Sequence, residues 1–159
     1  MKKVTPEGRK QCEAQGELFE ASTRLFPGGS AVFVRRFMRS KLARRLDEGA
    51  FLVEPSSPEH MLDELEAEYG VCKYGSDVYS GDEMYWMGYL YRYWCLAYGM
   101  PSKTVYKTIG ARELRGLYYP YHTLAVEAAI ERIMEAKGLD EETPVERGVR
   151  LLKAIQSSA

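Results

Sequence analysis

The chain has 159 residues, 45% of them hydrophobic and 28% charged, and a formal net charge of −1, which predicts one globular domain with a core of useful size. Its opening "MKKVTPEGRKQCEAQ" lacks the apolar core of a signal peptide and no stretch predicts a membrane span, so we expect a cytoplasmic protein. The three cysteines are scattered without zinc-like spacing, which argues against a metal site and a disulfide framework.

Helix start and stop signals open the chain. Thr5-Pro6-Glu7 predicts the start of a helix that runs to Phe26, where "FPGGS" ends it. The next segment, "AVFVRRFMRSKLARRLDEGA", is predicted to be helical as far as Gly49, with a candidate break near Ser40. Its apolar residues recur four apart, at Val34, Met38 and Leu42.

Two capping boxes mark the helices of the middle of the chain. In "SSPEHMLDELEAEYG" the spacing of Ser56 and Glu59 predicts a helix start, and Gly70 predicts its end. The following "GVCKYGSDVY" predicts an irregular segment. Ser80 and Glu83 then form a second capping box, which starts a helix rich in aromatic residues.

The remaining third also has only helical signals. A short helix is expected from Ser102 to Gly110, "ARELRGLYY" continues to Pro120, and "TLAVEAAIERIMEAKG" has an amphipathic pattern. Thr143 starts a last capping box. We therefore expect an all-α fold, a compact multi-helix domain around the central aromatic helix at about residues 81–98. The whole chain, 1–159, would be one domain, with peripheral helices in 1–28 and 139–159.

The aromatic helix "MYWMGYLYRYWCLAY" is apolar on all sides, which is typical of a central helix covered by its neighbours. Arg92 is its only charge after Glu83, and burying an unpaired charge is costly, so we expect Arg92 to pair with a carboxylate. The acidic helix that precedes it offers the candidates Asp63, Glu64, Glu66 and Glu68.

Charge is distributed unevenly. Residues 1–50 carry 11 basic and 6 acidic residues, whereas residues 51–100 carry 2 and 9. At helical spacing Arg35, Arg36 and Arg39 share one face. Two interpretations stay open: the three guanidinium groups bind phosphates or carboxylates of a partner, or they form salt bridges over the acidic helix at 59–68.

The stretch "CLAYGMPSKTVYKTI" has the spacing of a helix-turn-helix. Cys95, Gly99 and Val105 occupy its small, turn and apolar positions. Pro101 and the low net charge count against DNA binding. The residues that would contact DNA are Lys103, Tyr106, Lys107, Arg112 and Arg115.

No motif indicates catalysis. His60 and His122 are the only histidines, and neither belongs to a nucleophile motif or a glycine-rich phosphate loop. We expect no catalytic residue, no bound metal and no cofactor, and therefore not an enzyme.

Three segments, "FVRRFMRSKLARRLDEG", "DEMYWMGYLYRYW" and "ARELRGLYYPYHTL", resemble an uncharacterised family of small bacterial helical proteins found among mobile and toxin–antitoxin genes, some beside ADP-ribosyltransferase-like toxins. The resemblance spans roughly residues 30–135 and implies an antitoxin-type binding protein without catalysis.

The hypothesis is thus an inhibitor that occludes a partner protein, either a toxin or a nucleic-acid-directed enzyme. The alternative is a helix-turn-helix DNA-binding regulator that uses residues 95–109. The candidate partner-binding residues are Arg35, Arg36, Arg39, Tyr118, Tyr119 and Tyr121.

Overall fold

The computed structural model describes residues 1–49, 56–139, 152–153 and 155–157, and in these ranges every regular element is a helix. The all-α prediction is confirmed. Two compact units divide the chain, Met1–Val126 and Glu127–Ala159. The capping box predicted at Thr143 lies outside the described residues. In the described ranges no helix has the length and apolar character needed to cross a membrane.

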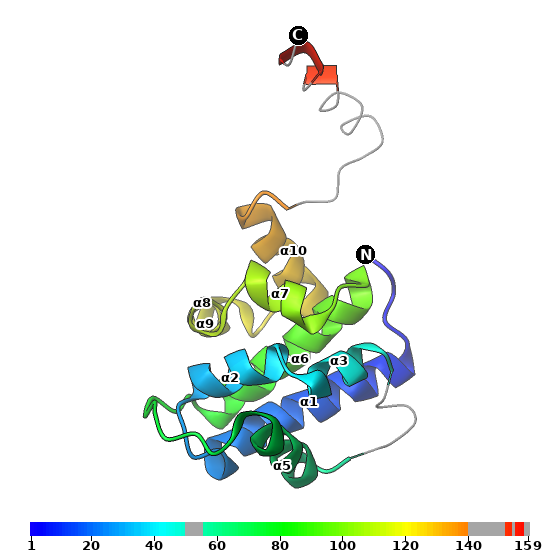
Figure 1. Cartoon of the computed structure of the whole chain (residues 1–159). Coiled ribbons are helices and arrows are strands. Elements are labelled where there is room, and N and C mark those ends of the chain that lie inside the picture. The colour runs from blue at the N-terminus through cyan, green and yellow to red at the C-terminus, as the bar shows by residue number, and fades with distance from the viewer. Residues whose placement is uncertain (50–55, 140–151, 154, 158–159) are drawn as a thin grey trace. The chain divides into compact units, whose positions relative to one another are not determined.

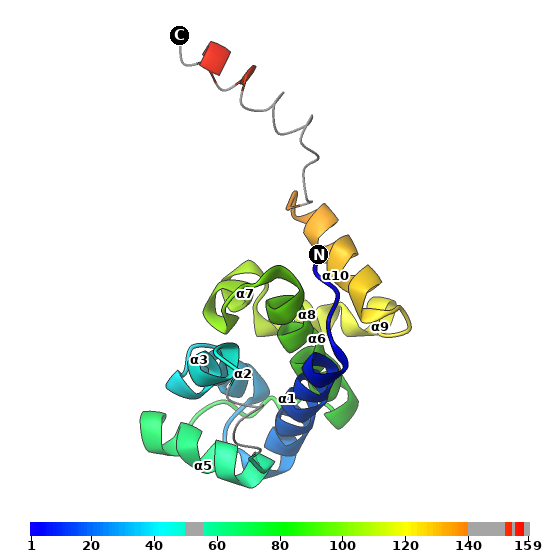
Figure 2. The same ribbon diagram turned by 90° about the vertical axis from the view of Figure 1, so that its right-hand side faces the viewer.

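Helices α1 (Pro6–Leu25) and α6 (Gly81–Tyr98) lie side by side in the first unit (Figures 1 and 2). The side chain of Thr5 caps α1 by accepting the Gly8 N–H at 3.0 Å. The capping box predicted at Ser80 is confirmed, and α6 ends at Gly99, whose φ of 62° is left-handed. The prediction that 1–28 is peripheral is wrong, because α1 packs along the central helix and buries its apolar face there.

The contact between α1 and α6 is closest at Gly88. A Cβ at this position would lie 2.6 Å from the Gln15 carbonyl oxygen and 2.7 Å from Cγ of Phe19, so only glycine fits. The Phe19 ring then packs edge-on against Phe33 and Phe37 of the next helix, with centroids 5.1 and 5.3 Å apart. These contacts form the core on the α1 side of α6.

Helices α2 (Ser30–Met38) and α3 (Lys41–Asp47) are separated at Ser40, as the sequence suggests. The Ser40 hydroxyl accepts the Ala43 N–H at 3.0 Å and caps α3. The pair α2–α3 lies between α5 (Pro58–Tyr69) and α7 (Ser102–Thr108) (Figures 1 and 2).

The start of α5 corrects a prediction. Its N-cap is Ser57, whose hydroxyl accepts the His60 N–H at 3.1 Å, and not Ser56. Pro58 then stands in the first turn, where its missing N–H costs nothing. The predicted end at Gly70 is confirmed, and residues 71–80 have no regular structure.

The chain continues through α8 (Ala111–Gly116) and α9 (Tyr118–Tyr121), so the segment predicted to run unbroken to Pro120 is interrupted at Leu117. Both short helices pack on α6, and α8 also packs on α2. Helix α10 (Val126–Ala136) has the predicted amphipathic pattern. Its buried residues are Ala129, Ile130, Ile133 and Met134.

Candidate functional site

A buried polar network fixes the helices that carry the charged surface. Arg92 is completely buried, and its Nη1 donates to Oδ1 of Asp47 at 2.7 Å while its Nε donates to Oε1 of Gln15 at 2.8 Å. The predicted carboxylate partner is therefore present, but its predicted location in the acidic helix is wrong. The end of α3 supplies it instead, because α3 packs on α7 whereas α5 lies on the other side of α2 and α3.

The same carboxylate caps α7. The N-cap residue Pro101 has no side-chain group to offer, and Oδ2 of Asp47 accepts the Ser102 N–H at 2.9 Å. The Ser102 hydroxyl donates to Oδ1 at 2.6 Å and accepts from Arg92 at 3.1 Å. Because α7 is held in this way at its first residue, the position of the next residue, Lys103, is fixed relative to α3.

The arginine cluster of α2 and Lys103 of α7 line a common surface pocket of about 350 Å³. We call it the cationic pocket. Its lining residues are Arg35, Arg36, Arg39, Tyr69, Tyr74 and Lys103. Four positively charged side chains, from α2 and its C-cap and from α7, thus line the pocket together with two tyrosines. Tyr69 is the last residue of α5, and Tyr74 lies in the segment that follows it.

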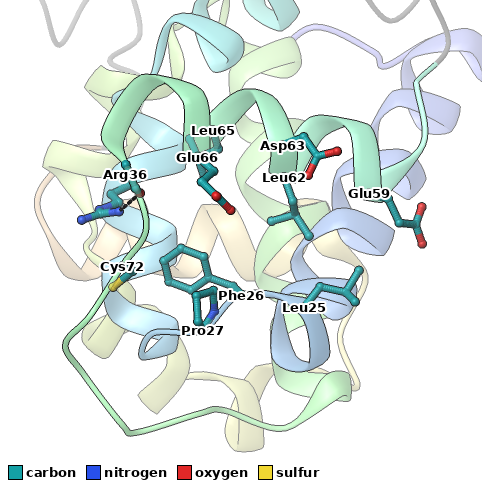
Figure 3. Close-up of a pocket in the computed structure, with 11 residues that line it drawn as sticks. Leu25, Phe26, Pro27, Arg36, Glu59, Leu62, Asp63, Leu65, Glu66 and Cys72 are labelled. Carbon is teal, nitrogen blue, oxygen red and sulfur yellow. Dashed lines mark hydrogen bonds between the residues drawn. The ribbon is translucent and has the colours of Figure 1, made fainter.

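Two of the arginines hold the tyrosines in place. Arg36 donates from Nη1 to the Gly70 carbonyl at 3.1 Å, and its guanidinium lies 5.5 and 5.6 Å from the ring centroids of Tyr69 and Tyr74 (Figure 3 shows the bond to the backbone). Arg35 donates from Nη2 to the Tyr74 hydroxyl at 2.8 Å. Arg35 and Arg36 therefore attach the segment after α5 to α2.

The other two cations have no such partner. In the described part of the chain the exposed side chains of Arg39 and Lys103 form neither a hydrogen bond nor an ion pair. The alternative that the arginines of α2 form salt bridges over the acidic helix is not observed among the described residues. It is α3 that pairs with α5, since Arg45 contacts Glu64.

The second predicted site adjoins the first. A pocket of about 510 Å³ shares Arg35 with the cationic pocket and is lined further by Tyr106, Arg112 and Glu113. Helix α2 packs against both α7 and α8, which brings the arginine cluster beside the proposed DNA-contacting residues. The sequence presents these as two separate sites, whereas in the structure they form one continuous surface.

The helix-turn-helix pattern predicts a buried inner side and an exposed outer side, and several of its residues fit this prediction. Cys95, Val105 and Ile109 are buried, while Lys103 and Lys107 are exposed. The helix α7 spans only seven residues.

Arg115 does not share the exposed surface of α7. It donates from Nε to Glu83 at 3.0 Å, and its guanidinium lies 4.3 Å from the Tyr79 ring centroid. Arg115 is thus attached to the first turn of α6 rather than presented for a phosphate.

The predicted tyrosines of α9 lie outside both pockets. Tyr118 stacks on His122 with ring centroids 4.4 Å apart and meets Trp86 edge-on at 5.7 Å. Tyr119 is 85% exposed and Tyr121 is partly exposed. Of the three, Tyr119 alone presents most of its surface to solvent.

A third pocket, of about 210 Å³, lies between the end of α1 and α5 (Figure 3). Leu62 points from α5 toward Phe26, and Asp63 and Glu59 lie along the same helix at its edge. Arg36 belongs to this pocket and to the cationic pocket, so its side chain forms part of the wall of both.

Sequence reasoning missed Tyr69, Tyr74 and Asp47. Tyr69 directly precedes the glycine that ends the acidic helix and Tyr74 lies four residues after it, and large aromatic residues near such a helix end are a signal that could have been used. Asp47 carried no signal of its own, because its role depends on where α7 lies.

The histidines are placed apart from any candidate nucleophile. His60 pairs with Glu64 at 3.3 Å, and the Nδ1 of His122 contacts the Tyr118 carbonyl at 2.8 Å. Neither imidazole hydrogen-bonds to a serine or cysteine side chain among the described residues. Within those residues no group of His, Cys, Asp and Glu is arranged to hold a metal ion.

Comparison of the chain with protein-family models, curated proteins and solved structures gives no match.

Proposed function

We propose that this chain is a non-catalytic binding protein that covers an acidic surface of a partner protein, as an antitoxin covers its toxin. The observation that supports it is the positive charge of the cationic pocket, above all Arg39 and Lys103, which no acidic side chain pairs with in the part of the chain that the structure describes. Like charges that converge without a counter-ion repel one another, and carboxylates of a partner would remove that repulsion.

The tyrosines of the pocket support a protein partner. Tyr74 is 51% and Tyr69 39% exposed, and tyrosine and arginine are enriched at the energetic centres of protein interfaces. Arg35 and Arg36 already hold both rings, so little side-chain freedom would be lost on binding.

Inhibition would be steric. The buried pair of Arg92 and Asp47 braces α3, α6 and α7 against one another, which gives the surface a rigid support. A rigid surface whose cations bind the acidic residues around an enzyme's cleft would exclude the substrate without any chemistry of its own.

The test uses the product of the gene adjacent to the one that encodes this chain. We expect the two purified proteins to form a complex, and the Arg39→Glu, Lys103→Glu variant to lose at least about tenfold in affinity. Arg44→Glu is the matched control, because Arg44 is exposed on α3 and lies outside the pocket. Equal loss in the control, or no complex with the original chain, would reject the proposal.

DNA binding through α7 is the second candidate function. It is favoured by the exposed Lys103 and Lys107 on α7, whose residue Val105 is buried, as is Ile109 at the C-cap. Binding to the duplex upstream of the gene should then weaken steeply with salt concentration.

The two functions need a variant that separates them, and Lys103 is unsuitable because it belongs to the cationic pocket. Lys107→Ala with Arg112→Ala is suitable, since neither residue lines that pocket. Loss of DNA binding with an intact protein complex would assign α7 to DNA. Loss of the complex alone, on Arg39→Glu, would assign the pocket to the partner protein.

A further inference from the structure

We infer that the cationic pocket is also a small-molecule site, which binds a nucleoside phosphate with the phosphate against Arg39 and Lys103 and the base against the ring of Tyr74. This goes beyond the proposed function, because it needs no partner protein.

The phosphate would meet cations that come from two separate helices. Arg39 follows the last turn of α2, and Lys103 stands in the first turn of α7. A guanidinium can donate two parallel hydrogen bonds to a phosphate, and a lysine ammonium adds a point charge. Since Asp47 fixes the first residue of α7, these two groups would converge on a phosphate without rearrangement of the backbone.

The base would meet an aromatic ring that is already oriented. Tyr74 is held by Arg35 through its hydroxyl and lies beside the guanidinium of Arg36, and about half of its surface stays exposed. Stacking on such a ring tolerates any base, because every base has a π face. Tyr69, on the other side of Gly70, is a second platform.

The charge around the pocket favours an anion. The pKa of Tyr69 is raised, by burial first and by Glu68 second, so its phenol stays neutral and does not repel a phosphate. The carboxylate of Glu68 accepts the Lys41 backbone N–H at 3.1 Å on both oxygens, and the four cations that line the pocket outnumber this one acidic group. The adjoining pocket is lined by Glu113 as well as by Arg35 and Arg112, so its excess of positive charge is smaller than that of the cationic pocket.

The size of the pocket favours a single nucleotide. Its volume of about 350 Å³ lies at the lower end of the range for small-ligand sites, roughly 300–1,000 Å³. A longer strand would have to extend past Arg35 into the adjoining pocket, which has the smaller excess of positive charge.

The test is a calorimetric titration of the full chain with AMP, adenosine and inorganic phosphate. We expect saturable binding of AMP and at least about tenfold weaker binding of the other two, because each lacks one of the two groups that the pocket recognises. Phosphate binding as tight as that of AMP, or no saturable binding of AMP, would overturn the inference. A single-stranded oligonucleotide that binds more than about tenfold tighter than AMP would also overturn it, in favour of a strand.

Separate variants test the cations that would bind the phosphate and the ring that would stack on the base. Arg39→Gln with Lys103→Gln should abolish AMP binding, whereas Tyr74→Leu should reduce AMP affinity to the level of phosphate and leave phosphate binding unchanged. Arg44→Gln, outside the pocket, should change nothing. Both altered cations are exposed, so these variants should unfold at the urea concentration of the original chain. Equal effects of the pocket and control variants would reject the site, whatever the fate of the partner complex.

Discussion

Arg92 and Asp47 form an ion pair across 45 positions of the chain, with Nη1 2.7 Å from Oδ1. The arginine side chain is completely buried and the aspartate is 15% exposed, so the pair is almost fully removed from water. The same carboxylate caps α7 through Ser102. Asp47 therefore pairs with the charged residue inside the aromatic helix and also fixes the helix that presents Lys103.

Asp47→Ala should destabilise the protein by about 3–5 kcal/mol, because it removes the carboxylate that pairs with the buried guanidinium of Arg92. Urea unfolding followed by circular dichroism measures the change. Glu48→Ala is the control, since this neighbouring residue is exposed and should change stability by less than about 0.5 kcal/mol. A loss of less than about 1 kcal/mol for Asp47→Ala would show that the pair does not hold α3, α6 and α7 together.

Replacing both partners should be less harmful than removing one. In Arg92→Met with Asp47→Leu no charge stays buried, so we expect recovery of about half the loss or more. The N–H of Ser102 would still lack its acceptor, which limits the recovery. If the double variant were as unstable as the single one, the buried charge could not be the main cause.

Gly88→Ala should destabilise the protein by about 1–3 kcal/mol, because the new methyl group would overlap the Gln15 carbonyl oxygen and the Phe19 ring. Gly116→Ala is the matched control, because a Cβ there meets nothing within 4 Å. The control should be neutral or slightly stabilising. Thermal unfolding of the two variants side by side distinguishes the packing effect from a general effect of alanine, and similar shifts would contradict it.

Glu83→Gln should destabilise the protein at neutral pH by about 1 kcal/mol. Burial alone would raise the pKa of Glu83, but the Ser80 N–H and the Arg115 guanidinium outweigh it, and the pKa lies below its ordinary value of 4.5. A lowered pKa contributes stability above the unfolded value, and this is lost as the pH falls through the folded value. The difference between the original chain and the variant should therefore shrink below about pH 4.5, in urea unfolding at several pH values.

Cys12 should resist alkylation in the folded protein. Burial, opposed in part by Arg92, raises the pKa of its thiol from 9.0 to about 12. At pH 8.5 iodoacetamide should therefore label Cys12 rapidly only in denaturant, as peptide mass spectrometry would show. The raised pKa stabilises the fold up to about pH 9, and this contribution is lost as the pH rises toward about 12. Rapid labelling without denaturant would contradict the burial.

Arg36→Gln should loosen the segment after α5, because it removes the hydrogen bond to the Gly70 carbonyl and the cation beside Tyr69 and Tyr74. We expect faster amide hydrogen exchange in residues 70–79 by about tenfold, with little change in α1 and α6. Arg39→Gln is the matched control on the same helix, since Arg39 has no hydrogen-bond partner among the described residues. Equal acceleration in both variants would argue against a positioning role for Arg36.

Local signals in the sequence were enough for most of the helices, although they placed the start of α5 at Ser56 and missed the break at Leu117. The capping box at Ser80 and the glycine at Gly99 predicted both ends of α6, because caps and left-handed glycines act within one turn of the chain. The apolar residues on all sides of the aromatic helix likewise predicted that α6 would be buried. The cost of an unpaired buried charge predicted that Arg92 would have a carboxylate partner.

Which carboxylate it is, and which cations share a pocket, depended on the tertiary structure. Asp47 reaches Arg92 only because α3 packs on α7, and Lys103 joins Arg39 only because α7 lies beside α2. Such contacts join residues tens of positions apart, and no local pattern encodes them. The sequence by itself determined most of the helices and which of their faces are apolar. Packing between helices decided the partner of the buried arginine and the composition of the cationic pocket.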